Sequence, residues 1–283
     1  MSNPAPTDVL GQREHQPVSR VDPPQKTASS WFFNVSGEQS AGLILGFVAG
    51  FVDVAGYLAL FGLFTANMTG NILLIAVELV QPRGDITLNR LVAVPLFRFG
   101  VLLGWLIAAQ AKRRAWHVAT VLISSEAIAL GLFAVVGTGY GPQLQSSSQQ
   151  ALIVAISTCS LIAMGLQNAL GQELSADMPT TTVMTNNLSL LMLEGAALVS
   201  AWLGGQPLAA NTSTRQRFAR IAPVFIGFLI GAMAGAFGMR HLGYSSLGVP
   251  IALLALLAVM RLKTDTSEVR DSGKVTGSVR ASR

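Results

Sequence analysis

Six long apolar blocks dominate the pattern of apolar and polar positions along the chain. A helix needs about 20 predominantly apolar residues to cross the hydrocarbon core of a bilayer. Each block approaches that length, alone or with its flanking residues, and therefore predicts a membrane-spanning helix. The blocks are Ala41–Leu63, Leu91–Ala111, Val118–Val136, Ala151–Leu170, Ile221–Met239 and Leu247–Leu262.

Two further segments are apolar but shorter or interrupted. Ala66–Val80 carries Glu78, and Thr180–Leu203 has a polar start and is interrupted by Glu194. Each is compatible with a full span, with a re-entrant half-helix or with an interfacial helix. We therefore expect an all-α polytopic membrane bundle of six full transmembrane helices plus two short polar-tipped helices, with eight transmembrane helices as the alternative.

The two halves of the chain carry the same features in the same order. Each half has a long apolar helix with a polar residue, a short polar-tipped segment, a Gly-x-x-x-Gly helix and a last helix. Four matching features in one order favour duplication over chance, with repeats at about 41–137 and 151–262. The matched residues are Gly50-Phe51-Val52-Asp53 with Gly165-Leu166-Gln167-Asn168, Ala66-Asn67-Met68-Thr69-Gly70-Asn71 with Thr182-Val183-Met184-Thr185-Asn186-Asn187, and Gly100 and Gly104 with Gly227 and Gly231.

The positive charges between the blocks orient the chain. With six spans, both short segments dip in and out of the membrane, the two halves are inverted, and Lys112, Arg113 and Arg114 face the cytoplasm. With eight spans, the halves are parallel and this basic cluster faces outward. Cytoplasmic loops carry an excess of Lys and Arg, which favours six spans slightly. Both alternatives place the two tails in the cytoplasm.

The composition is that of a membrane protein. Of 283 residues, 51% are hydrophobic and only 12% are charged, whereas a soluble domain has about 25% charged residues. The basic residues lie in tails and short loops, so the pI near 9.9 does not indicate nucleic-acid binding. The single cysteine, Cys159, excludes a disulfide framework and a Cys-rich zinc site. We expect the lipid bilayer as a partner, no nucleic acid, no metal and no cofactor, and we leave homo-oligomers open.

The two ends of the chain are polar. Residues 1–38 contain five prolines and mixed charges without an apolar period, and residues 264–283 are also polar. Such segments cannot bury enough apolar surface to fold alone. Both are predicted to be disordered cytoplasmic tails, which leaves residues 39–263 as the transmembrane domain.

Asp53 is the strongest candidate among the few ionisable residues of the apolar segments. It follows Gly50 by three residues on the helix face formed by Gly42, Gly46 and Gly50, and that face is suited to close helix packing. Asp53 is therefore expected to point into the bundle, either as a proton, cation or substrate site, or as a helix cap or ion-pair partner of Arg98. Arg98 alternatively pairs with Glu126 or extends to the membrane interface. The ionisable residues are Asp53, Glu78, Arg98, Glu126 and Glu194, and we expect Glu78 and Glu194 to be solvated near helix ends.

The uncharged polar residues of the two short segments match between the halves. Asn and Thr are good N-caps, and two capped helix starts brought together would form a polar site lined by helix dipoles. Interrupted helices at matching places in two repeats mark the substrate site of many transporters. The candidate binding residues are Asp53, Asn67, Thr69, Asn71, Arg98, Gln167, Asn168, Thr185, Asn186 and Asn187, and the candidate packing glycines are Gly42, Gly46, Gly50, Gly100, Gly104, Gly227 and Gly231.

Enzyme motifs are absent from the sequence. His15, His117 and His241 lie in tails or loops, and we find no zinc-protease, nucleophile-elbow, P-loop or dinucleotide motif. We therefore expect a non-enzymatic small-solute transporter or permease, with proton coupling through Asp53 as a hypothesis. The alternative is a non-transporting membrane scaffold or assembly factor, and an intramembrane enzyme is a weaker third option.

Four sequence elements together resemble the YoaK family of bacterial multipass membrane proteins, a domain of unknown function, over residues 41–262. The resemblance implies a bacterial inner-membrane location and supplies no substrate. Asn186 stands where that family usually has glycine in the second copy. The elements are Phe47-Val48-Ala49-Gly50-Phe51-Val52-Asp53, Ala66-Asn67-Met68-Thr69-Gly70-Asn71, Met164-Gly165-Leu166-Gln167-Asn168-Ala169 and Thr180-Thr181-Thr182-Val183-Met184-Thr185.

Overall fold

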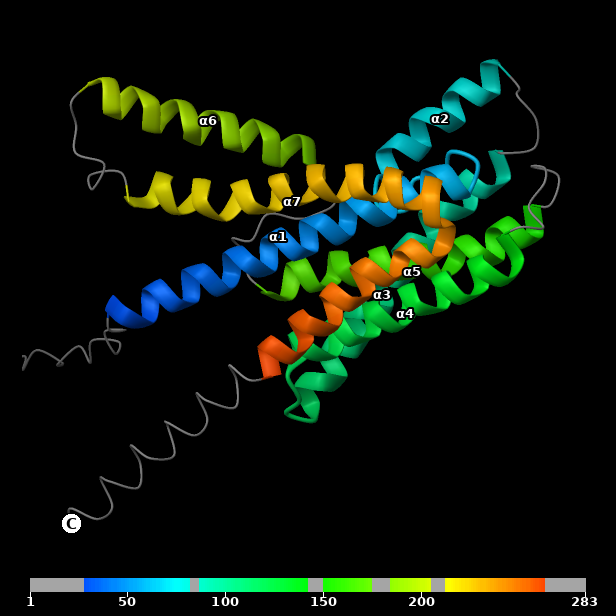
Figure 1. Ribbon diagram of the computed structural model, residues 1–283, viewed down its shortest axis with the longest axis horizontal. Coiled ribbons are helices and arrows are strands. Elements are labelled where there is room, and N and C mark those ends of the chain that lie inside the picture. Colours follow the sequence, from blue (N-terminus) through cyan, green and yellow to red (C-terminus); the bar gives the residue numbers. More distant parts are fainter. Residues whose placement is uncertain (1–27, 82–86, 142–149, 175–183, 205–211, 263–283) are drawn as a thin grey trace, which may run out of the picture.

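The computed structural model describes residues 28–81, 87–141, 150–174, 184–204 and 212–262. In these ranges every regular element is helical (Figure 1). The helices are α1 (Ala28–Ala59), α2 (Met68–Val80), α3 (Thr87–Arg113), α4 (Val118–Tyr140), α5 (Gln150–Leu174), α6 (Met184–Leu203) and α7 (Thr212–Leu242). A short 3-10 turn, η3 (Gly243–Leu247), leads into a last helix at 248–262.

Most of these helices have the length and hydropathy of membrane spans. The qualifying segments in the described part are Gln39–Ala59, Asn89–Arg113, Val118–Tyr140, Ala151–Glu173 and Thr212–Leu262. The last segment contains α7 and the final helix, which turns back at η3 (Figure 1). In contrast, α2 has 13 residues and is about 20 Å long, which is shorter than a hydrocarbon core of about 30 Å.

The helices α1 and α7 lie side by side and run in the same direction (Figure 1). A Cβ atom on Gly46 would lie 2.2 Å from the carbonyl oxygen of Val224, and one on Gly231 would lie 2.0 Å from the carbonyl oxygen of Phe47. Side chains cannot occupy these positions without moving a backbone. Glycines on both helices therefore bring the two backbones into direct contact.

A second parallel pair, α3 and α5, is packed in the same way. A Cβ atom on Gly100 would lie 2.8 Å from the carbonyl oxygen of Ile162, and one on Gly165 would lie 2.5 Å from the carbonyl oxygen of Phe97. Gly104 lies against Ala169, where an added Cβ would come within 2.5 Å of the alanine methyl group. The predicted packing glycines of α3 thus lie in a helix contact, as Gly46, Gly50, Gly227 and Gly231 do in the first pair.

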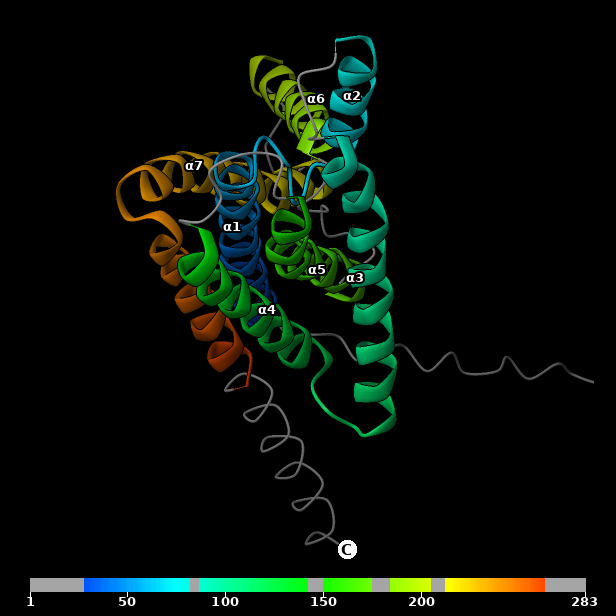
Figure 2. The same ribbon diagram turned by 90° about the vertical axis from the view of Figure 1, so that its right-hand side faces the viewer.

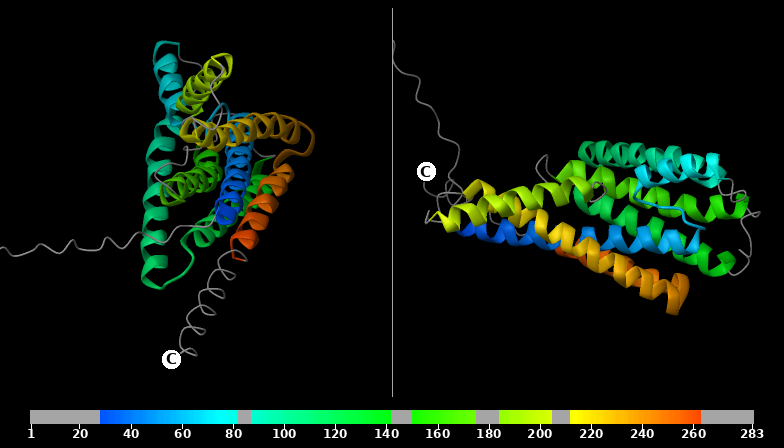
Figure 3. Two further views of the ribbon diagram at one scale, coloured as in Figure 1. Left: turned by 90° about the vertical axis from the view of Figure 1, so that its left-hand side faces the viewer. Right: turned by 90° about the horizontal axis from the view of Figure 1, so that it is seen from above.

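Contacts of α1 place the helices that flank α2 and α6. Arg90 of α3 donates to the carbonyl oxygens of Phe61 and Gly62, just beyond the end of α1. Gln167 of α5 donates to the carbonyl oxygen of Leu45 in the middle of α1, and α7 lies beside this part of α1. The helices α2 and α6 lie toward opposite ends of the molecule (Figure 3).

Two predicted boundaries are wrong. The helix α1 begins at Ala28, so residues 28–38 are helical and not disordered as predicted. The prolines of the predicted tail all lie at or before Pro24, and no proline separates it from α1. The helix also ends at Ala59 instead of Leu63, because the chain turns there. The rest of the predicted tails, 1–27 and 264–283, lies outside the described residues.

Candidate functional site

After α1 the chain turns back on itself. Phe61 and Gly62 adopt φ angles of +55° and +80°, a conformation that is easiest for glycine. A Cβ on Gly56 would lie 2.4 Å from the methyl group of Thr65, so this glycine leaves room for the returning chain. The returning chain brings the start of α2 beside Asp53. Asp53 precedes the end of α1 by about 9 Å along the helix axis, because each residue of a helix rises about 1.5 Å.

Asp53 holds this turn through backbone hydrogen bonds. Its Oδ1 accepts from the N–H groups of Thr65 (2.8 Å), Ala66 (2.7 Å) and Asn67 (3.3 Å). The residue is only 5% exposed, as the glycine face predicted. Three donated hydrogen bonds satisfy much of the acceptor capacity of a carboxylate. The geometry therefore favours the helix-cap interpretation of Asp53.

Arg98 does not serve as a partner for Asp53. It lies exposed on α3. Within the described part of the chain it forms no ion pair, and the Oδ1 atom of Asp53 is bonded to backbone groups instead. The suggested Asp53–Arg98 ion pair is therefore absent, and Arg98 is placed as a side chain that extends from the surface.

The amide side chains at the start of α2 complete the turn. Asn71 accepts from the N–H of Phe64 (2.9 Å) and donates to its carbonyl oxygen (2.7 Å), and it is fully buried. Asn67 is the N-cap of α2, with its side-chain oxygen accepting from Gly70 (3.0 Å). Asn71 is thus committed to the turn, whereas the side chains of Asn67 and Thr69 are exposed.

The start of α6 repeats several of these features. Asn187 is buried and donates to the sulfur of Met184 (3.8 Å), as Asn71 donates to the sulfur of Met68 (3.9 Å). Thr185 and Asn186 are exposed. Asn168, the counterpart of Asp53, is half-buried and accepts from Gln172 (3.3 Å). Residues 175–183, which precede α6, lie outside the described part.

The two polar helix starts come together about midway along the length of the bundle, on its outer side (Figure 2). In Figures 1, 2 and 3 the first turns of α2 and α6 approach each other, and the helices then diverge toward opposite ends. Four exposed polar side chains lie at these starts, namely Asn67, Thr69, Thr185 and Asn186. Gln167 does not join them, since its amide is bonded to Leu45 on α1.

Glu78 and Glu194 are paired with arginines, and the expectation that both are simply solvated is wrong. Glu78 of α2 forms an ion pair with Arg90 of α3, and the two side chains are only 8% and 7% exposed. Glu194 of α6 lies 3.4 Å from Arg217 of α7, whose side chain is 65% exposed. Each short helix is therefore tied to the following long helix by an ion pair, and only the first pair is buried.

This difference in burial leads to a testable prediction. Glu78→Gln is expected to lower the free energy of unfolding by about 3 kcal/mol, the lower end for breaking a buried pair, because Gln keeps one acceptor oxygen but leaves Arg90 charged. Glu194→Gln is the matched control, with an expected loss below about 1 kcal/mol because its partner Arg217 is 65% exposed. Thermal unfolding in detergent measures both, and equal losses would contradict the interpretation.

Glu126 is a buried carboxyl group that the candidate set did not include. It lies near the middle of α4 with 0% exposure. Among the described residues, neither of its carboxylate oxygens has a hydrogen-bond partner. From the sequence, Glu126 is one of the few ionisable residues in the apolar blocks. Its block is apolar on every face, so the sequence does not reveal that Glu126 points into the core.

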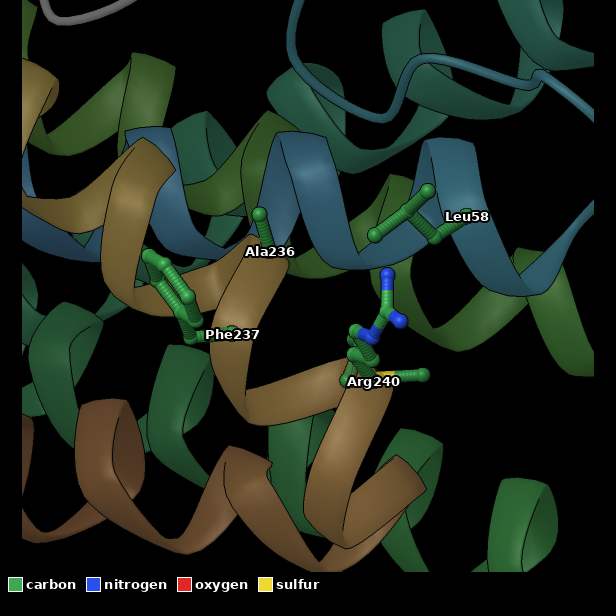
Figure 4. A pocket seen from close by; sticks show the side chains of 5 residues that line it. Leu58, Ala236, Phe237 and Arg240 are labelled. Carbon is green, nitrogen blue, oxygen red and sulfur yellow. The ribbon is translucent and has the colours of Figure 1, made fainter.

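A cavity of about 560 Å³ lies away from the helix starts. Figure 4 shows the side chains that line it, with the guanidinium of Arg240 directed toward Leu58. Its walls come from the end of α1 and the last turns of α7, namely Leu58, Ala236, Phe237, Met239 and Arg240. None of the candidate binding residues lines this cavity, and we assign it no role in the candidate site.

These features define a multi-pass membrane protein built from helices, with one buried ion pair and two further buried carboxyl groups, those of Asp53 and Glu126, among the described residues. The chain belongs to the DUF1275 family, described as proteins of unknown function, whose family model matches residues 41–260. The UPF0700 transmembrane protein YoaK of Bacillus subtilis (strain 168) is 33% identical over 152 residues, which cover 53% of this chain and 63% of that protein. The match therefore spans less than two thirds of that relative. The resemblance to the YoaK family is confirmed, and no solved structure matches the chain.

Proposed function

We propose that this protein is a small-solute transporter or permease of the bacterial inner membrane, and not an enzyme. The observation that carries the proposal is the approach of two polar helix starts, those of α2 and α6, about midway along the length of an apolar bundle (Figure 1). Interrupted backbone at membrane depth is tolerated only where it is buried in protein or lines a polar cavity. Such helix starts supply the substrate site in many transporters.

The proposal includes six full spans and two re-entrant helices. The support is that α3 begins beside the end of α1, through the bonds of Arg90 to Phe61 and Gly62. If α2 crossed the membrane, α3 would begin at the opposite face. The length of α2, 13 residues, argues in the same direction. The position of α6 toward the other end of the molecule supports an inverted relation between the two halves (Figure 3).

Matching contacts in the two parallel helix pairs support the internal repeat. Gly231 lies on the backbone of Phe47 as Gly100 lies on that of Ile162. Gly50 lies on Phe228 as Gly165 lies on Phe97, and Gly235 and Gly104 contact Phe51 and Leu166. By these contacts, Gly100 and Gly104 in the first half are equivalent to Gly231 and Gly235 in the second half. The sequence had matched them with Gly227 and Gly231, one helical turn earlier. A pseudo-two-fold relation would produce this exchange of partners between repeats.

Charge supports a cytoplasmic location for both chain ends. Lys112 at the end of α3 pairs with Glu173 at the end of α5 (2.6 Å), and Arg215 and Arg217 lie in the first turns of α7. The parallel pairing of α7 with α1 brings these basic residues to the end of the bundle where α1 enters. An excess of Lys and Arg marks the cytoplasmic side. The last helix returns toward this end (Figure 1).

One observation favours the alternative of a non-transporting scaffold. Asp53 and Asn71 form their hydrogen bonds within the turn itself, with partners at Thr65, Ala66 and Phe64. Groups used in this way stabilise the fold without binding a solute. On the scaffold interpretation, the exposed polar groups of the helix starts contact protein or lipid headgroups. A transport assay on variants of these exposed groups separates the two functions.

The Thr69→Val, Thr185→Val double variant is expected to lower solute uptake at least about fivefold. Two exposed hydroxyl groups at the helix starts are removed with little change in volume, and a hydrogen bond contributes about 0.5–1.5 kcal/mol. The measurement is uptake by proteoliposomes of a panel of labelled amino acids, sugars and organic acids. Thr138→Val is the matched control, because Thr138 is exposed on α4 and bonds only its own helix. Absence of uptake by a folded wild-type protein, or an unchanged double variant, would favour the scaffold.

A further inference from the structure

The buried carboxyl group of Glu126 does not belong to the proposed solute site at the starts of α2 and α6. It lies on the face of α4 that packs into the core, between Leu122 and Leu130, and these neighbours are also fully buried. Within the described residues, no donor reaches Oε1 or Oε2 and no cation pairs with the side chain. A carboxyl group in this position is expected to be functional, because such residues are costly inside a membrane protein.

The ionisable groups of α5, α3 and η3, which all pack against α4, do not neutralise Glu126. On α5, Cys159 is half-buried, and Glu173 is paired with Lys112 at the end of the bundle. On α3, Arg98 is exposed and Arg90 is paired with Glu78. On η3, the ring of Tyr244 packs edge-on against Phe133 at 5.5 Å, and among the described residues its hydroxyl group has no partner.

The comparison with Asp53 shows what Glu126 lacks. Both carboxyl groups are buried, but Asp53 accepts three backbone hydrogen bonds that compensate a negative charge. Glu126 has no such compensation in the described structure. An ionised carboxylate without a partner in an apolar interior is far less stable than the neutral acid. The neutral acid also contains its own O–H donor.

We propose that Glu126 is a proton-binding site, which carries a proton in this conformation and exchanges it with water when the packing around α4 opens. Release breaks the O–H bond heterolytically, so that the proton passes to water and the electron pair stays on the carboxylate. Rebinding reverses this step from the other side of the membrane. Given the transport function proposed above, Glu126 rather than Asp53 is then the residue that couples solute movement to protons.

The proton itself is tested on the purified full-length protein, without any solute. Dicyclohexylcarbodiimide adds to protonated carboxyl groups in apolar surroundings and leaves a stable acylurea that mass spectrometry locates. We expect a label on Glu126 at neutral pH and an infrared carbonyl band of a protonated acid. Both signals should be lost in Glu126→Gln and kept in Asp53→Asn. Absence of both signals from a folded wild-type protein, or their persistence in Glu126→Gln, would overturn the proposal.

A second measurement addresses coupling and separates this inference from the transport proposal. Gln resembles the protonated acid in shape, so Glu126→Gln is expected to fold, to keep downhill uptake of the panel solutes, and to lose stimulation of uptake by an imposed pH gradient. Wild-type stimulation that persists in Glu126→Gln would exclude Glu126 as the coupling site. A labelled Glu126 in a protein that moves none of the panel solutes would leave the proton site in place and contradict only the transport function.

Discussion

Gly46→Leu is expected to prevent α1 and α7 from packing and to lower the stability of the bundle more than any other single change considered for the helix contacts. Even a Cβ atom at this position would lie 2.2 Å from the carbonyl oxygen of Val224 and 3.1 Å from its Cα atom. The obstacle is backbone, which cannot rotate away as a side chain can. The expected loss therefore exceeds about 3 kcal/mol, the upper end of the usual range for overpacking.

The control for this variant is Gly131→Leu. Gly131 also lies in a long apolar helix, but a Cβ atom there would meet nothing within 4 Å. The two variants carry the same substitution, so a change in helix propensity or in hydrophobicity affects both. Thermal unfolding in detergent and the yield of monodisperse protein measure the outcome. If Gly131→Leu is as damaging as Gly46→Leu, close packing of α1 on α7 is not what the glycine provides.

The apolar blocks could be located from the sequence because helix length and hydropathy are properties of each segment alone. Their ends could not be located as well. Phe61 and Gly62 form the turn that ends α1, and the apolar sequence continues through that turn to Leu63. Hydropathy does not distinguish an apolar residue in a helix from one in a buried turn, because both avoid water.

The inward position of Asp53 was predictable, and its partners were not. Three glycines at intervals of four residues define a face of α1, and this face packs in the bundle. The partners of Asp53 are backbone N–H groups at Thr65, Ala66 and Asn67. Every residue except proline has such a group, so no sequence pattern identifies which of them a carboxylate will bind.

The sequence also could not predict the ion pair of Glu78 or the lack of partners around Glu126 in the described structure. Arg90 lies just before the apolar block that begins at Leu91 and has the appearance of a loop residue. The return of the chain after α2 brings it into contact with Glu78. Glu126 lies in a helix that is apolar all round, and a periodicity of apolar residues cannot show which face of such a helix is buried.

Asp53→Ala is expected to release the turn between α1 and α2, with a loss of about 3 kcal/mol or more in the free energy of unfolding. Three backbone N–H groups lose their buried acceptor, and each unsatisfied group costs about 1–3 kcal/mol. Because this turn positions the start of α2, solute uptake should fall together with stability. Hydrogen exchange at residues 65–67 and thermal unfolding measure the local and the global effect.

Asp53→Asn distinguishes the structural role of this carboxyl group from a role in proton coupling. Asn keeps one side-chain oxygen at the place of Oδ1, so the turn should survive with a smaller loss of stability than in Asp53→Ala, and uptake should persist with its response to a pH gradient. Arg98→Leu should change neither stability nor the behaviour of Asp53→Asn, because Arg98 is exposed and forms no ion pair within the described residues. If Asp53→Asn is instead stable and inactive, Asp53 carries the coupling proton. If Arg98→Leu restores a destabilised Asp53→Asn, the two residues interact as an ion pair, and the backbone bonds to Thr65 and Ala66 are not the main use of the carboxylate.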